Sequence, residues 1–427
     1  MMFNGKQIQL PERIKKVAAE FGGRQVYIVG GYVRNKILGI GNTDIDLASS
    51  LMPEEVLDIF GDRAKLVNEK LGTVHIKCGD EIFEHTTFRT ESYPQGGYHT
   101  PESVKIGVSL EEDAFRRDFT MNALYADIYT GEIIDPTGRG VSDVLHRMIM
   151  TTTPDPYRIM NDDGLRLLRM VRLAGQLDFF IEDELMACAK NNVDLLDAIS
   201  KERIYKELQL ILMADTKHEC NCDGHRRALL YMKYTGLLKK VFPIYPFVGG
   251  EEKDVYMLID VCTSMPRDFT LRLAALFLLE EHYVARNTLI NLKAENDRTD
   301  FIASVIAYKD YARRGLPSDA DIRKQIQRMG KKQFQALTTL RRSEDMETGK
   351  MGNWRAFMDV CERMEEENYP FTAGDLAVDG RTIMRELGLR PGRQIGYILS
   401  KLLEWCAEDA SHNEKQKLLQ KAREIMK

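Results

Sequence analysis

Two aspartates that follow a glycine turn constrain the fold of this 427-residue chain more than any other feature. The apolar run 26–29 leads into Gly30 and Gly31, a helix-like stretch comes next, and Asp44 and Asp46 then stand in a second apolar segment. This order predicts a strand, a turn, a helix and another strand. Because residues two apart on a strand point to the same face, we expect the two carboxylates to lie side by side.

Paired carboxylates near a helix start indicate phosphoryl-transfer chemistry. Like charges held this close repel each other unless a cation lies between them. Hard divalent ions such as Mg²⁺ bind carboxylate oxygens together with substrate phosphates, and backbone N–H groups at a helix start bind further phosphates. We therefore predict nucleotidyl transfer, with Asp44 and Asp46 as catalytic metal ligands. Glu84, in the strand-like segment 82–87, is a candidate third catalytic carboxylate, and its alternative is an exposed strand residue.

Length and patterning indicate a globular protein of two to four domains. About the first 140 residues alternate between strand-like and helical patterns, whereas helical periodicity dominates beyond Pro156. The polar segment 89–101 contains two glycines and is expected to be a mobile loop. No apolar run approaches the ~20 residues that cross a bilayer, and the N-terminus lacks a signal-peptide core. We expect a cytoplasmic protein with no membrane partner.

The net charge of −5 gives no global sign of a nucleic-acid partner, so a positive field that binds RNA must be local. One stretch of basic residues is a candidate, although such runs are usually solvated helix faces. Its members are Arg313, Arg314, Arg323, Lys324, Arg328, Lys331, Lys332, Arg341 and Arg342.

Four potential metal ligands also fall in one short stretch: His218, Cys220, Cys222 and His225. The C-x-C spacing is tighter than that of most zinc sites, and no second pair follows. The seven cysteines of the chain are scattered, which is typical of reduced thiols. A polar loop is the favoured interpretation of this stretch.

The segment 116–123 packs two guanidinium groups, a carboxylate and an amide into what would be two helical turns. The planar fork of Arg117 suits the oxygens of a triphosphate. Asp118 and Asn122 are four residues apart, so on one helix face they could hold a ribose hydroxyl. The alternative is a helix cap with a surface ion pair.

A third cluster, 162–166, opens a helical pattern after a proline-rich joint. Asp163 and Arg166 would be neighbours on a helix surface. Cytosine and adenine each present an amine donor beside a ring-nitrogen acceptor, which matches one carboxylate and one guanidinium. Uracil and guanine present the reverse pattern, and each unpaired buried polar group costs ~1–3 kcal/mol. The pair could select C and A without a template, and the alternative is an acidic cap with a salt bridge.

Taken in order, these segments resemble the class II tRNA nucleotidyltransferase and poly(A) polymerase family, which includes the bacterial CCA-adding enzymes. The string Arg-Arg-Asp-Phe-Thr-x-Asn-Ala is highly specific, and the matches cover roughly the first half of the chain. The matching stretches are 30–34, 44–47, 116–123, 134–136, 163–166 with Arg169, and 199–204 with Glu207 and Leu208; 375–396 also resembles the family's tRNA-binding tail.

The resemblance implies an α+β protein: a small mixed α/β nucleotidyltransferase head, like that of DNA polymerase β, followed by mostly helical domains. The expected domains are a catalytic head at 1–143, a base-recognising neck at 144–212, a helical body at 213–316 and a tRNA-binding tail at 317–427. The segment 89–101 corresponds to a flexible loop that these enzymes need for adding A.

The resemblance also implies roles for individual residues. Asp44 and Asp46 would bind the metal, the glycine turn with Arg34 would meet the triphosphate, and Asp163 with Arg166 would pair with the base. Two departures stand out, since Asn35 replaces the usual Asp and Asp162 the usual Glu. The expected nucleotide-binding residues are Gly30, Gly31, Arg34, Arg117, Asp118, Asn122, Asp163, Arg166 and Arg169.

We therefore expect an Mg²⁺-dependent enzyme that adds CMP and AMP, from CTP and ATP, to the 3′ end of tRNA and releases pyrophosphate. The alternatives are an A-adding or CC-adding enzyme, a poly(A) polymerase, or a non-catalytic RNA-binding module. The retained loop favours full CCA addition over CC addition, and the absence of a basic C-terminal extension argues against a poly(A) polymerase. The paired aspartates argue against the binding module, and the oligomeric state stays open.

Overall fold

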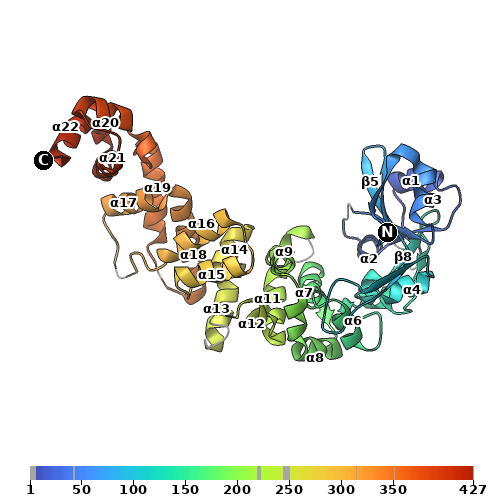
Figure 1. Cartoon of the computed structure of the whole chain (residues 1–427). Coiled ribbons are helices and arrows are strands. Elements are labelled where there is room, and N and C mark those ends of the chain that lie inside the picture. The colour runs from blue at the N-terminus through green and yellow to red at the C-terminus, as the bar shows by residue number, and fades with distance from the viewer. Residues whose placement is uncertain are drawn as a thin grey trace. The chain divides into compact units, whose positions relative to one another are not determined.

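The computed structural model describes residues 6–41, 44–218, 223–243, 251–313, 315–350 and 352–426 (Figure 1). The chain divides into two compact units, Met1–Pro243 and Ile244–Lys427. This division falls inside the segment 213–316 that the sequence analysis assigns to a helical body. The finer division into four domains stays a prediction.

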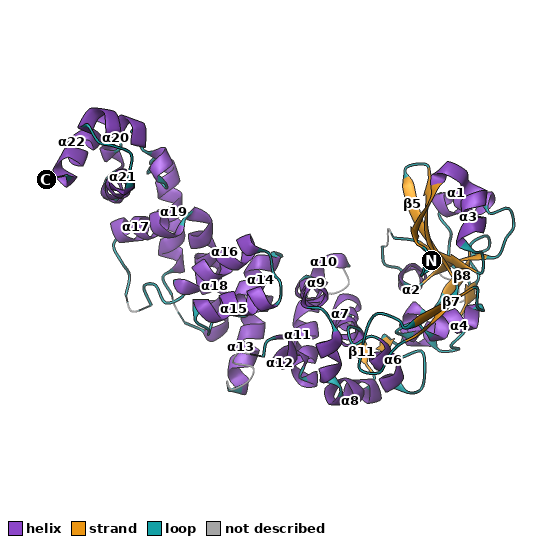
Figure 2. Ribbon diagram, viewed as in Figure 1, coloured by secondary structure: helices purple, strands orange, loops and turns teal. Residues whose placement is uncertain are grey.

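A seven-stranded mixed sheet forms the core of the N-terminal unit, and Figure 2 shows the strands gathered there. Neighbouring strands are antiparallel except for β2 and β5, which are parallel. In sheet order the strands are β3 (Ala64–Asn68), β4 (Thr73–Cys78), β5 (Glu81–Thr87), β2 (Asp46–Ser49), β1 (Val26–Val29), β8 (Tyr125–Asp127) and β9 (Ile133–Ile134). The predicted strand at 26–29 is confirmed, because its apolar side chains fill the centre of this sheet.

The turn after β1 fixes where the second strand begins. Gly30 adopts a φ of 76°, which favours glycine, and it leads directly into helix α2 (Gly31–Leu38). Since β1 ends at this turn, the last pair with β2 joins Val29 to Asp46. The expectation that both aspartates lie on the strand was therefore wrong for Asp44, which precedes β2 and stands before the first residue of its register with β1.

The helices of the N-terminal unit cover the sheet and continue beyond it as a bundle. Gly175 and Gly224 let α7 and α11 approach closely, because a Cβ on Gly175 would lie 2.3 Å from the carbonyl oxygen of Gly224. The helices are α1 (Glu12–Glu20), α2, α3 (Pro53–Phe60), α4 (Leu110–Phe115), α5 (Gly140–Leu145), α6 (Pro156–Asp162), α7 (Arg166–Leu177), α8 (Asp183–Asn191), α9 (Lys201–Leu212), α10 (Ala214–Lys217), α11 (Gly224–Thr235) and α12 (Leu237–Val241).

Two short sheets complete this unit. β6 (Arg89–Ser92) pairs with β7 (Ser103–Ile106), and β10 (Met148–Ile149) pairs with β11 (Phe180–Ile181). The prediction of a loop over 89–101 was thus wrong for its first four residues. They form a strand because a partner strand lies just beyond the loop.

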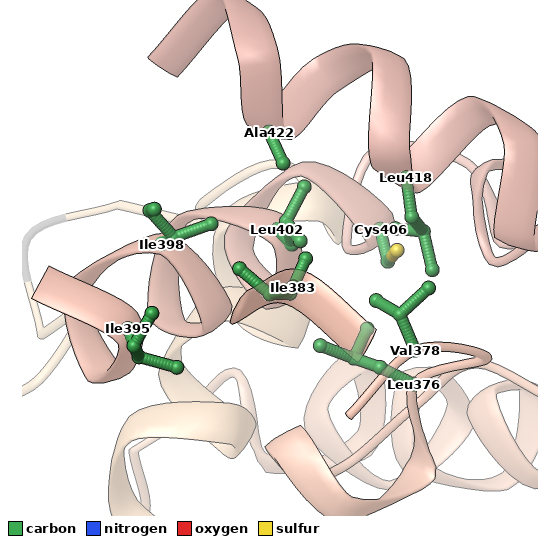
Figure 3. Close-up of a cluster of buried hydrophobic side chains, with 9 residues drawn as sticks. All are labelled: Leu376, Val378, Ile383, Ile395, Ile398, Leu402, Cys406, Leu418 and Ala422. Atoms are coloured by element: carbon green, nitrogen blue, oxygen red, sulfur yellow. The ribbon is translucent and has the colours of Figure 1, made fainter. Parts of the chain in front are cut away.

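In the C-terminal unit the described residues form helices, turns and loops without a strand. Its last helices enclose an apolar cluster centred on Ile383, Leu402 and Leu418 (Figure 3). None of the helices in the described ranges is both long and apolar enough to cross a membrane. The helices are α13 (Glu252–Thr263), α14 (Phe269–Ala275), α15 (His282–Asn291), α16 (Asn296–Ala307), α17 (Asp319–Met329), α18 (Lys331–Thr348), α19 (Trp354–Glu366), α20 (Gly380–Leu387), α21 (Arg393–Cys406) and α22 (Lys415–Ile425).

Much of the basic stretch in this unit is engaged within the protein. Arg314 lies outside the described residues. Arg323 donates from Nε to the carbonyl oxygen of Ala407 at 2.6 Å, so it joins α17 to the end of α21. Four further cations form ion pairs: Arg313 with Glu344, Lys324 with Glu408, Arg328 with Glu404, and Lys331 with Glu365. These pairs reduce the positive field that the sequence of the stretch indicates.

A buried histidine lies in the sheet beside the candidate catalytic strand. His85 on β5 is fully buried, and its Nε2 lies 2.8 Å from Oγ of Ser49 on β2. Its Nδ1 has no hydrogen-bond partner. Burial lowers the pKa of His85 to about 4, because a charged imidazolium would lose its hydration there.

Acidification should therefore destabilise the N-terminal unit through this side chain. Below about pH 6.5 the unfolded chain protonates His85 while the folded chain does not, so the free energy of unfolding falls as pH falls towards 4. Between about pH 6.5 and pH 5 the loss should be about 2 kcal/mol. Urea unfolding of the wild type and of His85→Gln over this range measures it. The difference in stability between the two proteins should change with pH, and a constant difference would contradict the assignment.

Candidate active site

A cavity of about 650 Å³ lies in the N-terminal unit. Its walls come from the β1–α2 turn, from the segment after α4, and from α7, α9 and α10. It brings together every residue that the sequence analysis assigns to nucleotide binding, together with one of the three candidate catalytic carboxylates. These residues are Gly30, Gly31, Arg34, Asp46, Arg117, Asp118, Asn122, Asp163, Arg166 and Arg169.

Asp46 also lines a second, smaller cavity, where it meets Asp44 and Glu84. Asp46 and Glu84 are register partners on the parallel strands β2 and β5. Loss of hydration raises the pKa of Asp46, and the negative charges of Glu84 and Asp44 raise it further. A carboxylate whose neighbours disfavour its charge is a good ligand for a hard cation, so the donor set fits a divalent metal.

The role of Glu84 as a third ligand stays a prediction. Its Oε2 lies 3.4 Å from Nε2 of His75 on the neighbouring strand. Within the described ranges, no three His, Cys, Asp or Glu side chains come close enough to form a complete metal cluster. Divalent ions bound by only one or two carboxylates commonly take their other ligands from substrate phosphates and water.

Arg34 supplies a buried positive charge beside the β1–α2 turn. Its Nε and Nη2 donate to Oδ1 of Asn35 at 3.0 and 2.9 Å, and Nη1 donates to Oδ1 of Asn122. Burial lowers the pKa of Arg34 to about 10, and the positive charge of Arg172 contributes. Its hydrogen-bond acceptors are neutral amides, so much of its charge is left to act on an anion in the cavity.

The segment 116–122 is not the continuous helix that its spacing predicts. Helix α4 ends at Phe115, and a single 3₁₀ turn at Thr120–Asn122 follows. The two polar groups nevertheless meet, because Nδ2 of Asn122 donates to Oδ1 of Asp118 at 3.0 Å. The predicted proximity is correct, although the helix face that motivated it was wrong.

Two ion pairs orient the charged groups of this segment. Arg117 donates from Nη2 to Oδ2 of Asp113 at 2.9 Å, and the Nη2 of Arg169 on α7 lies 2.6 Å from Oδ2 of Asp118. Burial alone would raise the pKa of Asp118, but Arg169 holds it well below its usual value. The sequence analysis missed Asp113, although its spacing of four residues from Arg117 is a recognisable signal.

Asp163 and Arg166 do not share a helix, which corrects the prediction for this pair. Helix α6 ends at Asp162, Asp163 is extended with φ −149° and ψ 106°, and α7 begins at Arg166. The residues from 163 to 165 form a turn, in which Oδ1 of Asp163 accepts the N–H of Leu165 at 3.0 Å. Only glycine fits at position 164, since a Cβ there would lie 2.3 Å from the carbonyl oxygen of Leu195.

Each member of the pair is held by other groups. Nη2 of Arg203 on α9 lies 3.3 Å from Oδ2 of Asp163. Arg166 is buried and donates to the carbonyl oxygens of Ile159 and Arg116 at 2.8 and 3.0 Å. Both side chains line the cavity and retain hydrogen-bonding capacity for a base. Sequence reasoning assigned no role to Arg203, although it lies in one of the matched stretches.

The loop between β6 and β7 docks against the same turn. The backbone N–H of Gly97 donates to the carbonyl oxygen of Asn161, and the N–H of Gly164 donates back to Gly97, both at 3.0 Å. Gly96 donates to Oδ1 of Asn161 at 2.9 Å. This loop therefore contacts the residues on both sides of Asp163.

The stretch 218–225, for which a polar loop was favoured over a metal site, cannot be tested, because Cys220 and Cys222 lie outside the described residues. His218 lines the large cavity, and burial lowers its pKa to about 4. His225 is buried and lies 3.6 Å from Oδ1 of Asp215. The two histidines thus have different surroundings.

A buried ion pair forms part of the cavity wall. Nε of Arg172 on α7 lies 2.7 Å from Oε2 of Glu207 on α9, and Nη1 donates to Oε1 of Gln176 at 3.0 Å. Both charged side chains are about one-tenth exposed. Because the pair joins α7 to α9, Glu207 holds together the helices that carry Arg169 and Arg203.

Glu207→Gln should destabilise the chain by about 3 kcal/mol, because Arg172 would keep a buried charge without its carboxylate. Denaturant unfolding measures the loss, and Glu202→Gln, an exposed change on the same helix, is the matched control. Adding Arg172→Met should restore part of the stability. A Glu207→Gln protein within about 0.5 kcal/mol of the wild type would contradict the role assigned to this pair.

Comparisons with known proteins agree with this geometry. A family model described as the poly A polymerase head domain matches residues 26–150, and one described as a probable RNA and SrmB-binding site of polymerase A matches residues 178–247. The CCA-adding enzyme of Lactobacillus helveticus is 30% identical over 400 residues, which cover 92% of each chain. That of Lactobacillus delbrueckii subsp. bulgaricus is 32% identical over 391 residues, which cover 90% of each chain.

The fold also matches a solved structure. The crystal structure of the Bacillus stearothermophilus CCA-adding enzyme in complex with CTP aligns with a TM-score of 0.75 at 26% identity, covering 98% of each chain. The mixed sheet therefore belongs to a nucleotidyltransferase head. Full-length similarity, head fold and cavity agree, and the chain belongs to the family of CCA-adding enzymes, which are tRNA nucleotidyltransferases.

Proposed function

We propose that this protein adds CMP and AMP, from CTP and ATP, to the 3′ end of tRNA without a nucleic-acid template. The observation that carries the proposal is a single cavity, of a size that suits one nucleotide, with three chemistries in its wall. Asp46 would hold the metal, Arg34 lies beside the glycine turn, and Asp163 with Arg166 would read the base; all four line the cavity.

The substrates follow from the relatives and from the chemistry of the cavity. The Bacillus stearothermophilus relative was solved with CTP, another CCA-adding enzyme with ATP, and the Thermotoga maritima enzyme with tRNA. For this chain we propose CTP and ATP as nucleotide donors and a tRNA 3′ end as the acceptor. The proposed head, neck, body and tail would then place tRNA recognition mainly in the residues after 316.

Asp44 and Asp46 would hold Mg²⁺ together with phosphate oxygens of the nucleotide. When bound, the metal lowers the pKa of the attacking 3′-hydroxyl and neutralises charge on the leaving pyrophosphate. The backbone N–H groups at the start of α2 and the guanidinium of Arg34 would bind the triphosphate. Arg117 and Asn122 would orient the nucleotide, and Asp118 would fix Asn122.

Base selection would rest on Asp163 and Arg166. The carboxylate accepts from the exocyclic amine of cytosine or adenine, and the guanidinium donates to the neighbouring ring nitrogen or carbonyl oxygen. Uracil and guanine would leave both protein groups without a partner. Because Arg203 and the turn at 163–165 hold these groups, the protein itself would replace the template.

The rival functions keep the chemistry and change the product. An A-adding or CC-adding enzyme would add only part of the sequence, and a poly(A) polymerase would add many adenylates. Incubation with labelled CTP or ATP and tRNAs that end before CCA, after C and after CC separates these products on a sequencing gel. Addition of C, C and A in turn supports the proposal, whereas a single added A, a CC stop or a long A tract would contradict it.

Asp46→Asn should abolish incorporation while tRNA binding persists, because the change removes a metal ligand but leaves the fold and the basic surfaces in place. We expect at least about a hundredfold loss in rate. Chelation of Mg²⁺ should stop the wild type equally, and added Mg²⁺ should restore it. Asp58→Asn, an exposed change on α3, is the matched control. Asp46→Asn with wild-type incorporation would exclude the catalytic role.

Asp163→Ala or Arg166→Ala should change base choice, either by admitting U and G or by stopping C and A addition. Loss of one hydrogen-bonding partner should alter the CTP:UTP preference at least about tenfold. Competition assays with the four nucleoside triphosphates measure this ratio. Arg158→Ala, an exposed arginine on α6, serves as the control. Unchanged selectivity in both cavity variants would refute base reading by this pair.

A further inference from the structure

Positively charged side chains outnumber carboxylates in the wall of the large cavity. Most of its arginines are already paired with a carboxylate: Arg117 with Asp113, Arg169 with Asp118, and Arg172 with Glu207. These pairs shape the cavity but contribute little net charge to it. Cations of the cavity wall that have no carboxylate partner are therefore the ones whose charge is available to attract an anion.

Lys217 is such a cation. It is the last residue of α10, its side chain is exposed, and it lines the cavity. Across the part of the chain that the structure describes, no carboxylate lies within ion-pair distance of Lys217. None of the segments that carry the family resemblance includes it. The segment before α11 therefore contributes an unneutralised ammonium group to the site.

The electrostatic neighbours of Lys217 indicate which part of the cavity it serves. Its charge acts on Asp46, where it opposes the loss of hydration and the acidic neighbours that raise that pKa. The adjacent His218 has its pKa lowered by burial, then by the positive charges of Arg34 and Lys217. The charge of Lys217 thus acts on Asp46, the proposed metal ligand, and the charge of Arg34 acts on the adjacent residue His218.

We propose that Lys217 contacts the β- and γ-phosphates of the incoming nucleoside triphosphate and stabilises the departing pyrophosphate. This inference rests on the proposed function. In the reaction the RNA 3′-oxygen forms a bond to the α-phosphorus, the bond from that phosphorus to the β-bridging oxygen breaks, and the hydroxyl proton passes to water. Negative charge accumulates on the bridging oxygen, and a nearby ammonium group stabilises it.

A phosphodiester of the RNA is the other phosphate that a cavity lysine could meet. The triphosphate is favoured because it would span the interval between Asp46, on which the charge of Lys217 acts, and Arg34, whose charge acts on the adjacent His218. A nucleoside monophosphate lacks the two outer phosphates. Comparing CTP, CMP and inorganic pyrophosphate therefore isolates the contact.

The test is calorimetric binding of CTP, CMP and pyrophosphate to the full chain with Mg²⁺ and without tRNA. Lys217→Ala should weaken CTP and pyrophosphate binding about five- to tenfold and leave CMP binding unchanged. Lys217→Arg should retain most of the affinity. Lys239→Ala, an exposed lysine on α12 outside this cavity, is the matched control. In steady-state assays Lys217→Ala should raise the KM for CTP. It should also slow pyrophosphorolysis, the reverse reaction.

Two results would overturn the inference while leaving the proposed function intact. One is a Lys217→Ala protein with wild-type affinity for both CTP and pyrophosphate. The other is weaker tRNA binding with unchanged pyrophosphate affinity, which would assign Lys217 to the RNA. A wild-type protein that neither binds CTP nor extends tRNA would instead overturn the proposed function itself.

Discussion

The ion pair between Asp118 and Arg169 connects the segment that follows α4 to helix α7. Asp118 is buried, and through Asn122 and Arg34 its hydrogen bonds continue to Asn35 in α2. One continuous polar chain therefore runs from α7 to the turn after β1. Because each member has a partner, α7 and the β1–α2 turn are held at a set distance, which under the proposed function would fix the base-reading groups relative to the phosphate-binding turn before a nucleotide arrives.

The cavity is lined by many arginines and also by Asp46, which shares a second cavity with Asp44 and Glu84. The repulsion among the arginines and that among the carboxylates must each be offset by groups of opposite charge. Burial lowers the pKa of both Arg34 and Arg172, and the positive charges of Arg172 on Arg34 and of Arg169 on Arg172 lower these pKa values further. Glu207 and Asp118 offset this charge within the wall. On the opposite side, Asp46 lacks a comparable cation at ion-pair distance among the described residues. Under the proposed function, a metal-bound triphosphate would satisfy both requirements, since its cation would meet the acids and its phosphates would meet the arginines.

Local sequence rules predicted the parts of the site that depend on neighbouring residues. The strand at 26–29 follows from its apolar run, and the turn and the start of α2 follow from Gly30, a residue that readily adopts the positive φ found there. The same rules failed where tertiary contacts decide the backbone. The pairs Asp118–Asn122 and Asp163–Arg166 have helical spacing, yet Asp118 precedes the 3₁₀ turn that contains Asn122, and the second pair spans a break between helices. Partners about 40 to 50 residues away in the chain hold these segments, and no spacing rule reveals them.

Selection of a base without a template requires hydrogen-bonding groups that do not turn to suit the wrong base. A free aspartate or arginine could rotate to accept either pattern, so discrimination depends on what holds each side chain. Arg203 holds the carboxylate of Asp163, and two carbonyl oxygens hold Arg166. Backbone hydrogen bonds from the loop at Gly97 fix the turn itself. Under the proposed function, the turn would therefore keep Asp163 and Arg166 in the arrangement that matches the amine and ring nitrogen of cytosine and adenine.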